Sequence, residues 1–419
     1  MSASDVLEHA HAVLGVDRSG WRTVKFGNVV RSAKVSVDPE TSGLDRYVAG
    51  EHMATDDLHI RRWGTVGEGY LGPAFHRKFT AGQVLYGSRR TYLRKVAVAD
   101  FDGICANTTF VLESAGDDLL PELLPFIMQT EAFTDHSVKN SKGSVNPYVN
   151  WGDIATFEFA LPPNDEQRRI AAILWAADAC GSSLENGVER ALASKQMMLS
   201  QLTHRGLGST ALRQSKIGPI PEQWDTPNLG DLLQLCQYGL SIPANTTSTI
   251  PIFRMMNLED GIVVENDMKF VELNDSDLAT YRLERGDILF NRTNSAALVG
   301  KVGVYDLEGT HVFASYLIRV RAKPDRILPK YLNYFLNSSR GQERILAFAT
   351  PGVSQTNINA SNLKQVVVPL PSLQEQAQII DLVEQTQLTL ASLRTHRTQT
   401  FGLRKALINK LIGARHDHL

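Results

Sequence analysis

Two stretches of the chain repeat their apolar residues every seven positions, each over about forty residues. In the first stretch, apolar residues recur along 170–198 and, four positions on, along 174–202. The same grid reappears along 379–407 and 383–411. Spacing of this kind places apolar side chains on one face of an α-helix. The pattern therefore predicts two long amphipathic helices, each roughly 60 Å long at 1.5 Å per residue.

Each predicted helix needs a partner, because a long helix with one apolar face must bury that face against something. Asn164 and Ser372 stand where N-cap residues are expected, and acidic residues follow them in the first turn. Lys195, Arg397 and Arg404 interrupt the apolar seams. We therefore expect a packed pair, in which each helix is partnered by its own copy, in place of a regular leucine zipper.

The sequence before each helix alternates short β-rich runs with Gly- and Asn-containing turns, which predicts mixed α and β structure. One helix is predicted after Pro121 and another from Pro329, because apolar residues follow both at helical spacing. Predicted strands lie at 83–86, 108–112, 287–290, 302–305 and 316–320.

The chain consists of two copies of one unit. Residues 161–167 (Leu-Pro-Pro-Asn-Asp-Glu-Gln) match residues 370–376 (Leu-Pro-Ser-Leu-Gln-Glu-Gln) at an offset of 209 positions. Upstream matches follow in order, at offsets of 208, 204 and 203: Pro121 with Pro329, Gly82 with Gly286, and Trp21 with Trp224. Small insertions in loops account for the drift. The period is too long for a solenoid or a propeller.

The repeat predicts an α+β fold with two similar mixed α/β domains, joined and followed by the long helices. A Gly- and Pro-rich segment after residue 205 marks the boundary between the copies. We place the first domain at 1–160, the first long helix at 161–208, the second domain at 209–369 and the second long helix at 370–419.

Composition indicates a soluble, cytoplasmic protein. Hydrophobic residues make up 43% of the chain and charged residues 21%, which is ordinary for a protein with packed cores. The chain has neither an apolar run long enough to span a membrane nor a secretory signal. Cys105, Cys180 and Cys236 are isolated, which favours a reducing compartment and gives no zinc-ligand spacing.

Charge is unevenly distributed, although the net charge is only −2. Residues 61–95 carry a local charge of +7 with Tyr70, Phe75, Tyr86 and Tyr92 interleaved, whereas residues 256–287 carry −6. Such polarity lets one face meet phosphates while another repels them. The alternative is ordinary solvated surface charge, but the interleaved aromatic residues favour binding.

Motifs for catalysis are missing from the sequence. It contains no phosphate-binding loop, no zinc-protease helix and no nucleophile motif. Residues 145–148 (Val-Asn-Pro-Tyr) faintly resemble the Asn-Pro-Pro-Tyr motif of adenine N6-methyltransferases but lack its second proline. An enzyme is therefore the weaker hypothesis.

Polar loops recur at matching places in the two copies, at 87–92 and 291–295, and again at 140–144 and 352–357. Arg, Asn and Gln can form paired hydrogen bonds with guanine or adenine edges, and Lys and Ser can hold phosphates. Taken singly, each of these residues is better explained by turn formation. As a set they favour DNA recognition, with the following candidate contact residues: Arg89, Arg90, Arg94, Lys142, Ser144, Asn291, Arg292, Asn294, Gln355 and Asn357.

These motifs resemble those of the specificity subunits of type I restriction-modification systems, over essentially the whole chain. The resemblance is carried by residues 286–293, 299–302 and 352–359, by the two Leu-Pro signatures with their Glu-Gln pairs, and by residues 218–224. The first copy departs from the family at 87–90, where Gly-Ser-Arg-Arg replaces the usual Arg-Thr/Ser-Gly type of loop.

The resemblance implies two target-recognition domains, each reading one half of an interrupted site in double-stranded DNA. The two helices would form an antiparallel coiled-coil-like pair that measures the gap between the halves. The subunit would be non-catalytic and bind no cofactor directly. It would recruit two methyltransferase subunits that use S-adenosylmethionine and, through them, restriction subunits that use ATP and Mg²⁺.

Two other hypotheses stay open on the sequence alone. A self-contained DNA methyltransferase or nuclease would need cofactor or metal residues that no motif supplies. A coiled-coil scaffold that does not bind DNA would explain the helices but not the polar loops.

Overall fold

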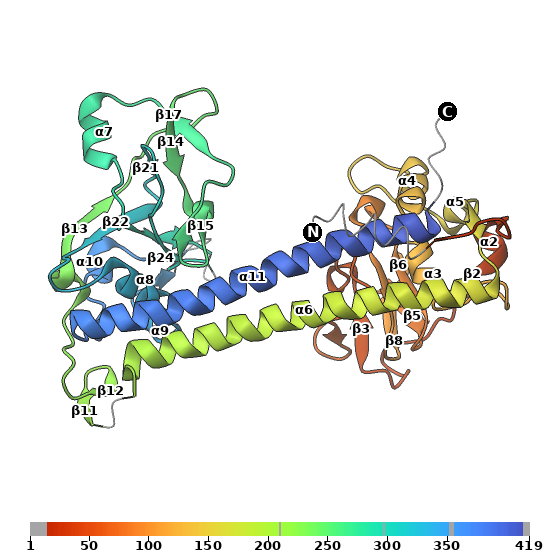
Figure 1. Ribbon diagram of the computed structural model, residues 1–419, viewed down its shortest axis with the longest axis horizontal. Helices are drawn as coiled ribbons and strands as arrows, with labels where there is room; N and C mark the ends of the chain where they lie inside the picture. Colours follow the sequence, from red (N-terminus) through yellow and green to blue (C-terminus); the bar gives the residue numbers. More distant parts are fainter. Residues whose placement is uncertain (1–14, 209–210, 296–297, 352–355, 414–419) are drawn as a thin grey trace. The chain divides into compact units, whose positions relative to one another are not determined.

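The computed structural model describes residues 15–208, 211–295, 298–351 and 356–413. The chain divides into two compact units (Figure 1). Unit 1 comprises residues up to Asn186 together with the segment from Arg394 onward, and unit 2 comprises Gly187–Leu393. Both boundaries fall inside the long helices, α6 (Asn164–Arg205) and α11 (Leu373–Ile412). Each long helix therefore contributes one part to each unit.

Unit 1 contains two four-stranded sheets, with strand orders β2-β9-β6-β7 and β4-β3-β8-β5, and a separate antiparallel pair of β1 with β10. Its strands are β1 (Arg22–Lys25), β2 (Val30–Ala33), β3 (Arg46–Val48), β4 (Gly64–Thr65), β5 (Phe75–Phe79), β6 (Val84–Gly87), β7 (Val96–Val98), β8 (Gly103–Ala106), β9 (Thr109–Ser114) and β10 (Glu158–Leu161). Its short helices are α2 (Phe26–Val29), η1 (Gly50–His52), η2 (Thr91–Leu93), α3 (Leu124–Ile127), α4 (Glu131–Lys139) and α5 (Trp151–Ala155).

Unit 2 is built around a six-stranded sheet of order β13-β22-β18-β20-β16-β15. Its strands are β11 (Leu212–Ser215), β12 (Gly218–Pro221), β13 (Leu233–Tyr238), β14 (Ile250–Phe253), β15 (Leu258–Glu259), β16 (Ile262–Val263), β17 (Lys269–Val271), β18 (Ile288–Asn291), β19 (Thr293–Asn294), β20 (Val302–Val304), β21 (Val312–Phe313), β22 (Leu317–Ala322), β23 (Thr350–Pro351) and β24 (Thr356–Asn357). Its helices are η3 (Leu229–Leu232), η4 (Met255–Asn257), α7 (Asp275–Tyr281), α8 (Pro329–Asn337), α9 (Ser339–Leu346) and α10 (Ala360–Leu363).

The mixed α/β architecture and most predicted elements are confirmed. The runs predicted as strands correspond to β6, β9, β18, β20 and β22, within one or two residues at each end. The helix predicted from Pro329 is α8, whereas the one predicted after Pro121 is the single-turn α3, followed by α4. The Gly- and Pro-rich segment after α6 forms the β11–β12 hairpin, whose Ile220 is buried in the core of unit 2.

The long helices are confirmed, and within unit 1 they run antiparallel. Asp178 of α6 lies 3.1 Å from Arg404 of α11, and Glu185, two turns further along α6, lies 3.2 Å from Arg397, two turns back along α11. Apolar seam residues of both helices join the core of unit 1 at one end of the pair, among them Leu174. In unit 2, Ile379 and Val383 of α11 are fully buried with Leu202 of α6.

The first turns of the two helices are only partly as predicted. Ser372 is an N-cap, because its Oγ accepts a hydrogen bond from the Glu375 backbone N–H (3.2 Å). Asn164 is not: it is already the first residue of α6, and Pro163 stands at the position that matches Ser372. The Pro163 carbonyl accepts the first helical hydrogen bond, from the Gln167 N–H.

The repeat predicted from the sequence is present in the backbone hydrogen bonds. Phe26 N donates to Phe157 O in unit 1, and Leu229 N donates to Val366 O in unit 2, at the offsets of 203 and 209 found in the sequence. Further equivalent pairs are Gly87 N to Lys95 O with Asn291 N to Lys301 O, Ser88 N to Thr108 O with Arg292 N to Tyr316 O, and Val149 N to Ser88 O with Ile358 N to Arg292 O. The two units therefore share one frame.

Candidate nucleic-acid interface

The first predicted polar loop of unit 1 lies beside residues 147–149 at the end of β6. The Ser88 carbonyl accepts from the Val149 N–H (3.0 Å), and the Arg90 N–H donates to the Pro147 carbonyl (2.6 Å). We call residues 88–90 and 147–149 loop pair 1. Arg89 and Arg90 are exposed, and Arg90 adopts a left-handed backbone conformation with φ 49°. Loop pair 1 thus presents two arginines on a backbone that is fixed from both sides.

The second polar loop of unit 1 continues this surface. Lys142 forms an isolated β-bridge with Tyr148, and its Nζ lies 3.0 Å from Asp153 Oδ1. This ion pair helps to hold the pKa of Asp153 below its ordinary value, after the larger effect of the hydrogen bond from the Asn150 backbone. Ser144 is exposed. Tyr148 is 41% exposed and forms an isolated β-bridge with Arg89, so it is an aromatic residue of this surface that the sequence pattern did not single out.

Unit 2 presents the equivalent arrangement, which we call loop pair 2, residues 292–294 and 356–358. Strand β19 pairs with β24 through Thr293 opposite Asn357. The guanidinium of Arg292 lies 4.9 Å from the ring centroid of Tyr238, and its Nη2 donates to Asn357 Oδ1 (3.2 Å). The amide of Asn294 contacts Met255 Sδ at 3.1 Å.

Tyr238 is a further residue of loop pair 2 that the sequence reasoning did not identify. It ends β13, is 41% exposed, and its hydroxyl accepts a hydrogen bond from the Ala360 N–H (2.8 Å). A planar ring under the guanidinium restricts the rotamers of Arg292 and stabilises its charge. Strand-end aromatic residues are common in any β fold, so the sequence offered no signal that set Tyr238 apart.

Two predicted contact residues have largely buried side chains that bond within their own unit. Asn291 is fully buried, and its Nδ2 donates to the Leu298 carbonyl (3.1 Å), so it closes the loop from within. Arg94 has a side chain only 9% exposed, and its Nε lies 2.6 Å from Asp56 Oδ1. Both were inferred from residue type and loop position, which do not reveal burial. Gln355 lies outside the described residues.

The basic segment 61–95 is only partly a positive surface. Arg61 is paired with Asp57 (2.8 Å). Lys95 lies close to Arg90, and partial burial followed by that like charge lowers the pKa of its ammonium group. Among the aromatic residues, Tyr70 and Tyr92 are exposed at 91% and 52%. Tyr86 instead lies in the core, where burial raises its pKa to about 12.

The acidic segment 256–287 is also partly internal. Asp287 is fully buried, and both of its carboxylate oxygens accept hydrogen bonds from Arg321, at 2.7 and 2.9 Å. These bonds, with the attraction of the carboxylate, raise the pKa of Arg321. Asp267 is paired with Arg254 at 3.0 Å. The segment therefore contributes less negative field than its sequence charge indicates.

Over the described parts of the chain, His, Cys, Asp and Glu side chains do not gather in threes as a metal ion would require. Within the same parts, each helix is too short or too polar to cross a bilayer.

Comparison with known proteins gives a family match over most of the chain. Residues 44–193 and 221–399 match a family model described as the type I restriction modification DNA specificity domain. The chain is 31% identical over 204 residues to a putative type I restriction enzyme MjaX specificity subunit of Methanocaldococcus jannaschii, in an alignment covering 48% of each chain. It is 28% identical over 281 residues to the type I restriction enzyme EcoKI specificity subunit of Escherichia coli, covering 64% of this chain and 60% of that one.

The chain thus spans about half to three fifths of the length of these two relatives. A longer match, 22% identical over 413 residues, covers 94% of this chain and 92% of the MjaVIII specificity subunit of M. jannaschii.

Two solved structures share the fold. One, from work on complex assembly and conformational transition of the type I R-M system, gives a TM-score of 0.58 at 20% identity, covering 94% of this chain and 97% of that chain. The other, a type I restriction-modification S subunit from M. genitalium, gives 0.52 at 14% identity, with 94% and 96% covered. The family match, which covers both copies of the repeat, shows that the chain belongs to the type I restriction-modification DNA specificity family.

Proposed function

We propose that this chain is the sequence-specific DNA-binding subunit of a type I restriction-modification complex and reads a bipartite site, one unit for each half. The observation that carries the proposal is the pair of equivalent loop pairs. Their backbone hydrogen bonds match residue for residue, but Arg89 and Arg90 in unit 1 stand where Thr293 and Asn294 stand in unit 2. The same backbone arrangement with different side chains suits two units that recognise different DNA sequences.

The chemistry of the loop pairs fits base edges in the major groove. An arginine guanidinium can donate two hydrogen bonds to guanine O6 and N7, and an asparagine amide can pair with adenine N6 and N7. Arg89 and Arg90 would serve in this way in unit 1, and Arg292, with Asn357 beside it, in unit 2. Lys142, Lys95 and the exposed basic side chains near them would neutralise phosphates, which makes binding salt-dependent.

The proposed subunit supplies recognition and leaves the chemistry to its partners. Two methyltransferase subunits would bind it and carry S-adenosylmethionine, and restriction subunits joining through them would use ATP and Mg²⁺. Methylation assayed with the purified chain alone tests the rival proposal of a self-contained enzyme, and we expect no product. A gel shift with random duplex at low salt tests the scaffold hypothesis, and we expect retarded DNA.

The decisive experiment maps methylated adenines in the host genome with and without this chain. We expect one interrupted motif to lose its methylation when the chain is deleted. Substituting Arg292 by Ala in the intact complex should reduce the discrimination between bases in one half of that motif by about 5- to 150-fold, since a bidentate contact is worth roughly 1–3 kcal/mol. An unchanged methylation pattern after deletion would refute the proposal.

The long helices would fix the gap between the two half-sites. Inserting or removing one helical turn in α6 or α11 should change the spacer length of the selected site and leave both half-site sequences unchanged. Selection from duplexes with randomised half-sites and variable spacers measures both properties at once. Altered half-sites with an unaltered spacer would contradict this role.

A further inference from the structure

Arg404 breaks the apolar seam of α11, and in unit 1 it is buried against the domain formed by residues 15–161. Its side chain is 8% exposed, and its Nε lies 3.1 Å from Asp178 of α6, itself only 5% exposed. Its two terminal nitrogens bond to residues outside the helix pair. Nη1 donates to the Asp56 carbonyl (2.9 Å) and Nη2 to Gln129 Oε1 (2.5 Å). Arg404 therefore joins both long helices to the domain.

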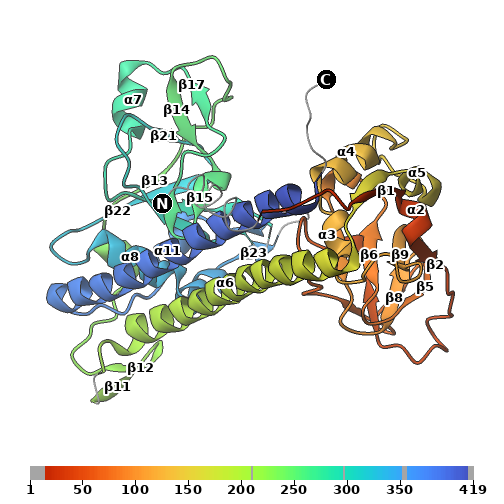
Figure 2. The same ribbon diagram turned by 45° about the vertical axis from the view of Figure 1, so that its right-hand side comes forward.

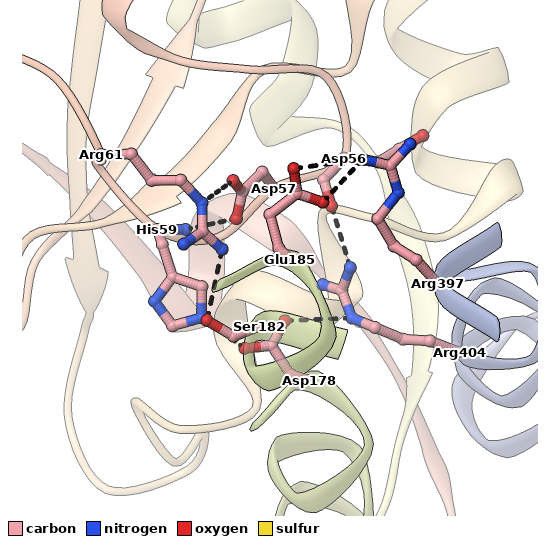
Figure 3. Close-up of polar contacts among 9 residues, drawn as sticks. All are labelled: Asp56, Asp57, His59, Arg61, Asp178, Ser182, Glu185, Arg397 and Arg404. Atoms are coloured by element: carbon pink, nitrogen blue, oxygen red, sulfur yellow. Dashed lines mark hydrogen bonds and ion pairs between the residues drawn. The ribbon is translucent and has the colours of Figure 1, made fainter. Parts of the chain in front are cut away.

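Other residues of the segment that contains Asp56 also make polar contacts with α6 (Figure 3). His59 Nε2 lies 2.7 Å from Asp178 Oδ2, and Arg61 donates to Ser182 Oγ (3.3 Å). The neighbouring ion pair of Glu185 with Arg397 differs, because it joins the two helices to each other and is more than one third exposed on both sides.

From Asp56 and Gln129 the contacts continue to loop pair 1 through Arg94. Arg94 Nε donates to Asp56 Oδ1 and its Nη2 to the Gln129 carbonyl, both at 2.6 Å. The single turn of η2 separates Arg94 from Arg90, with the Leu93 N–H donating to the Arg90 carbonyl and the Arg94 N–H to the Thr91 carbonyl. Both arginines have left-handed backbone conformations, which hold only where the surroundings fix them.

Unit 2 places a different set of residues at the corresponding points of the repeat. Lys195 stands 209 positions before Arg404, Gln387 matches Asp178, and Asn337 matches Gln129. These three residues line a hollow of about 250 Å³, where unit 1 has its buried arginine. The tight arginine contact is thus a property of unit 1 and is not required by the shared frame.

We propose that Arg404 is a positioning residue for DNA recognition by unit 1. Its contacts to Asp56 and Gln129, relayed by Arg94, hold loop pair 1 in one place on the helix pair. This position sets both the sequence discrimination in that half-site and the single spacer length accepted. The inference rests on the proposed function and deepens it, because Arg404 itself contacts no base.

The test uses the full chain assembled with its methyltransferase subunits, and a duplex library randomised in both half-sites and in spacer length. The test variant replaces both buried charges, as Asp178→Leu with Arg404→Met. Apolar replacement of a whole buried pair is often tolerated, whereas losing one partner leaves an uncompensated charge. The matched control is Glu185→Leu with Arg397→Met, and Arg404→Lys serves as the conservative variant. Arg292→Ala identifies the half-site of unit 2.

We expect the double variant to fold with a lower thermal midpoint than the wild type, because the Asp56 carbonyl and Gln129 Oε1 lose their donor. It should lose about 5- to 10-fold in discrimination at the half-site of unit 1, and accept spacers one base pair longer and shorter. The half-site of unit 2 should keep its sequence, the control should match the wild type, and Arg404→Lys should recover part of the loss.

Unchanged discrimination and spacing in the folded double variant, or an equal loss at both half-sites, would overturn the positioning role. A wild-type complex that selects no interrupted motif would instead overturn the proposed function.

Discussion

Gln167 and Gln376 show how a single residue of the repeated Leu-Pro signature acts. Each lies in the first turn of its long helix, at most 1% exposed. Gln167 Oε1 accepts from the Leu120 N–H, and its Nε2 donates to the carbonyls of Asp118 and Pro162. Gln376 makes the equivalent three bonds in unit 2. The amide therefore fastens the start of each helix to the loop before it.

Replacing Gln376 by Leu should lower the free energy of unfolding of unit 2 by about 2–4 kcal/mol, because three backbone groups, of which the Pro371 carbonyl is buried, would lose the hydrogen bonds that Gln376 makes. Chemical denaturation measures the loss. Gln385→Leu, on the exposed face of the same helix, is the control, and we expect a change below about 0.5 kcal/mol. Equal effects of the two variants would contradict the role of the amide.

His204, in the last turn of α6, makes the stability of unit 2 depend on pH. It is 2% exposed, and neither ring nitrogen has a hydrogen-bond partner among the described residues. Burial, followed by the charges of Arg340 and Arg344, lowers its pKa from 6.5 to about 4. On acidification the unfolded chain takes up the proton first, so stability falls between about pH 6.5 and 4.

His204→Phe should weaken this acid sensitivity, because the aromatic ring stays while the proton acceptor is lost. Urea unfolding at pH 7.5 and at pH 5 measures the difference. His396→Gln, at an exposed position of α11, should keep the wild-type dependence. A pH dependence left intact in His204→Phe would show that other groups cause it.

Residue type and position were enough to find the loops but not to rank their members. Arg94 and Asn291 are predicted to contact DNA, yet the Arg94 side chain is only 9% exposed, Asn291 is buried, and both bond within their own unit. From the sequence, Arg404 and Lys195 are only interruptions of the apolar seams of the long helices. Burial depends on contacts such as that of Arg404 with Asp56, 348 positions away, which no local pattern encodes.

At the scale of the element, the long helices were predictable because their seven-residue pattern extends over the whole stretch. Their ends follow local chemistry. Helix α6 ends just before Gly206, whose φ of +65° suits glycine. A Cβ there would lie 2.3 Å from Glu375 Oε1 and 2.8 Å from the Trp224 ring. That contact matters because Trp224 donates to the Glu375 carboxylate (2.9 Å).

Replacing glycines in or next to the long helices by alanine should therefore raise or lower stability, depending on the position. Gly181→Ala and Gly402→Ala lie inside helices with open space at the Cβ, and each should stabilise by about 0.5–1 kcal/mol. Gly206→Ala should destabilise by about 1–2 kcal/mol, since left-handed strain adds to displacement of Glu375. Thermal unfolding of the three variants measures this, and three shifts of one sign would refute it.

At the scale of the whole molecule, the last part of the chain completes the unit that the first part begins. Residues of α11 from Arg394 onward belong to unit 1. They supply the buried Leu407 and Leu411 of its core and the Lys405 that pairs with Glu131 at 2.7 Å. The sequence repeat alone assigns these residues to the second copy, so it predicts the domains but not this exchange.

Ending the chain after Leu393 should therefore unfold unit 1 and spare unit 2, although the deletion lies in the second copy. Hydrogen exchange measures this, with amides of β6 and β9 losing protection while those of β18 and β22 keep theirs. A synthetic peptide of residues 394–413, added in excess, should restore part of the protection. Preserved protection in unit 1 without the peptide would contradict the assignment.

The hydrogen bond between Arg404 and Asp56 joins residues that are synthesised far apart in time. On the ribosome the N-terminal domain emerges first, and domains normally fold as they emerge. Here the domain of residues 15–161 cannot form its contact with Arg404 until almost the entire chain has been synthesised. An interrupted translation product therefore lacks this contact and, under the proposed function, carries an incomplete first recognition unit.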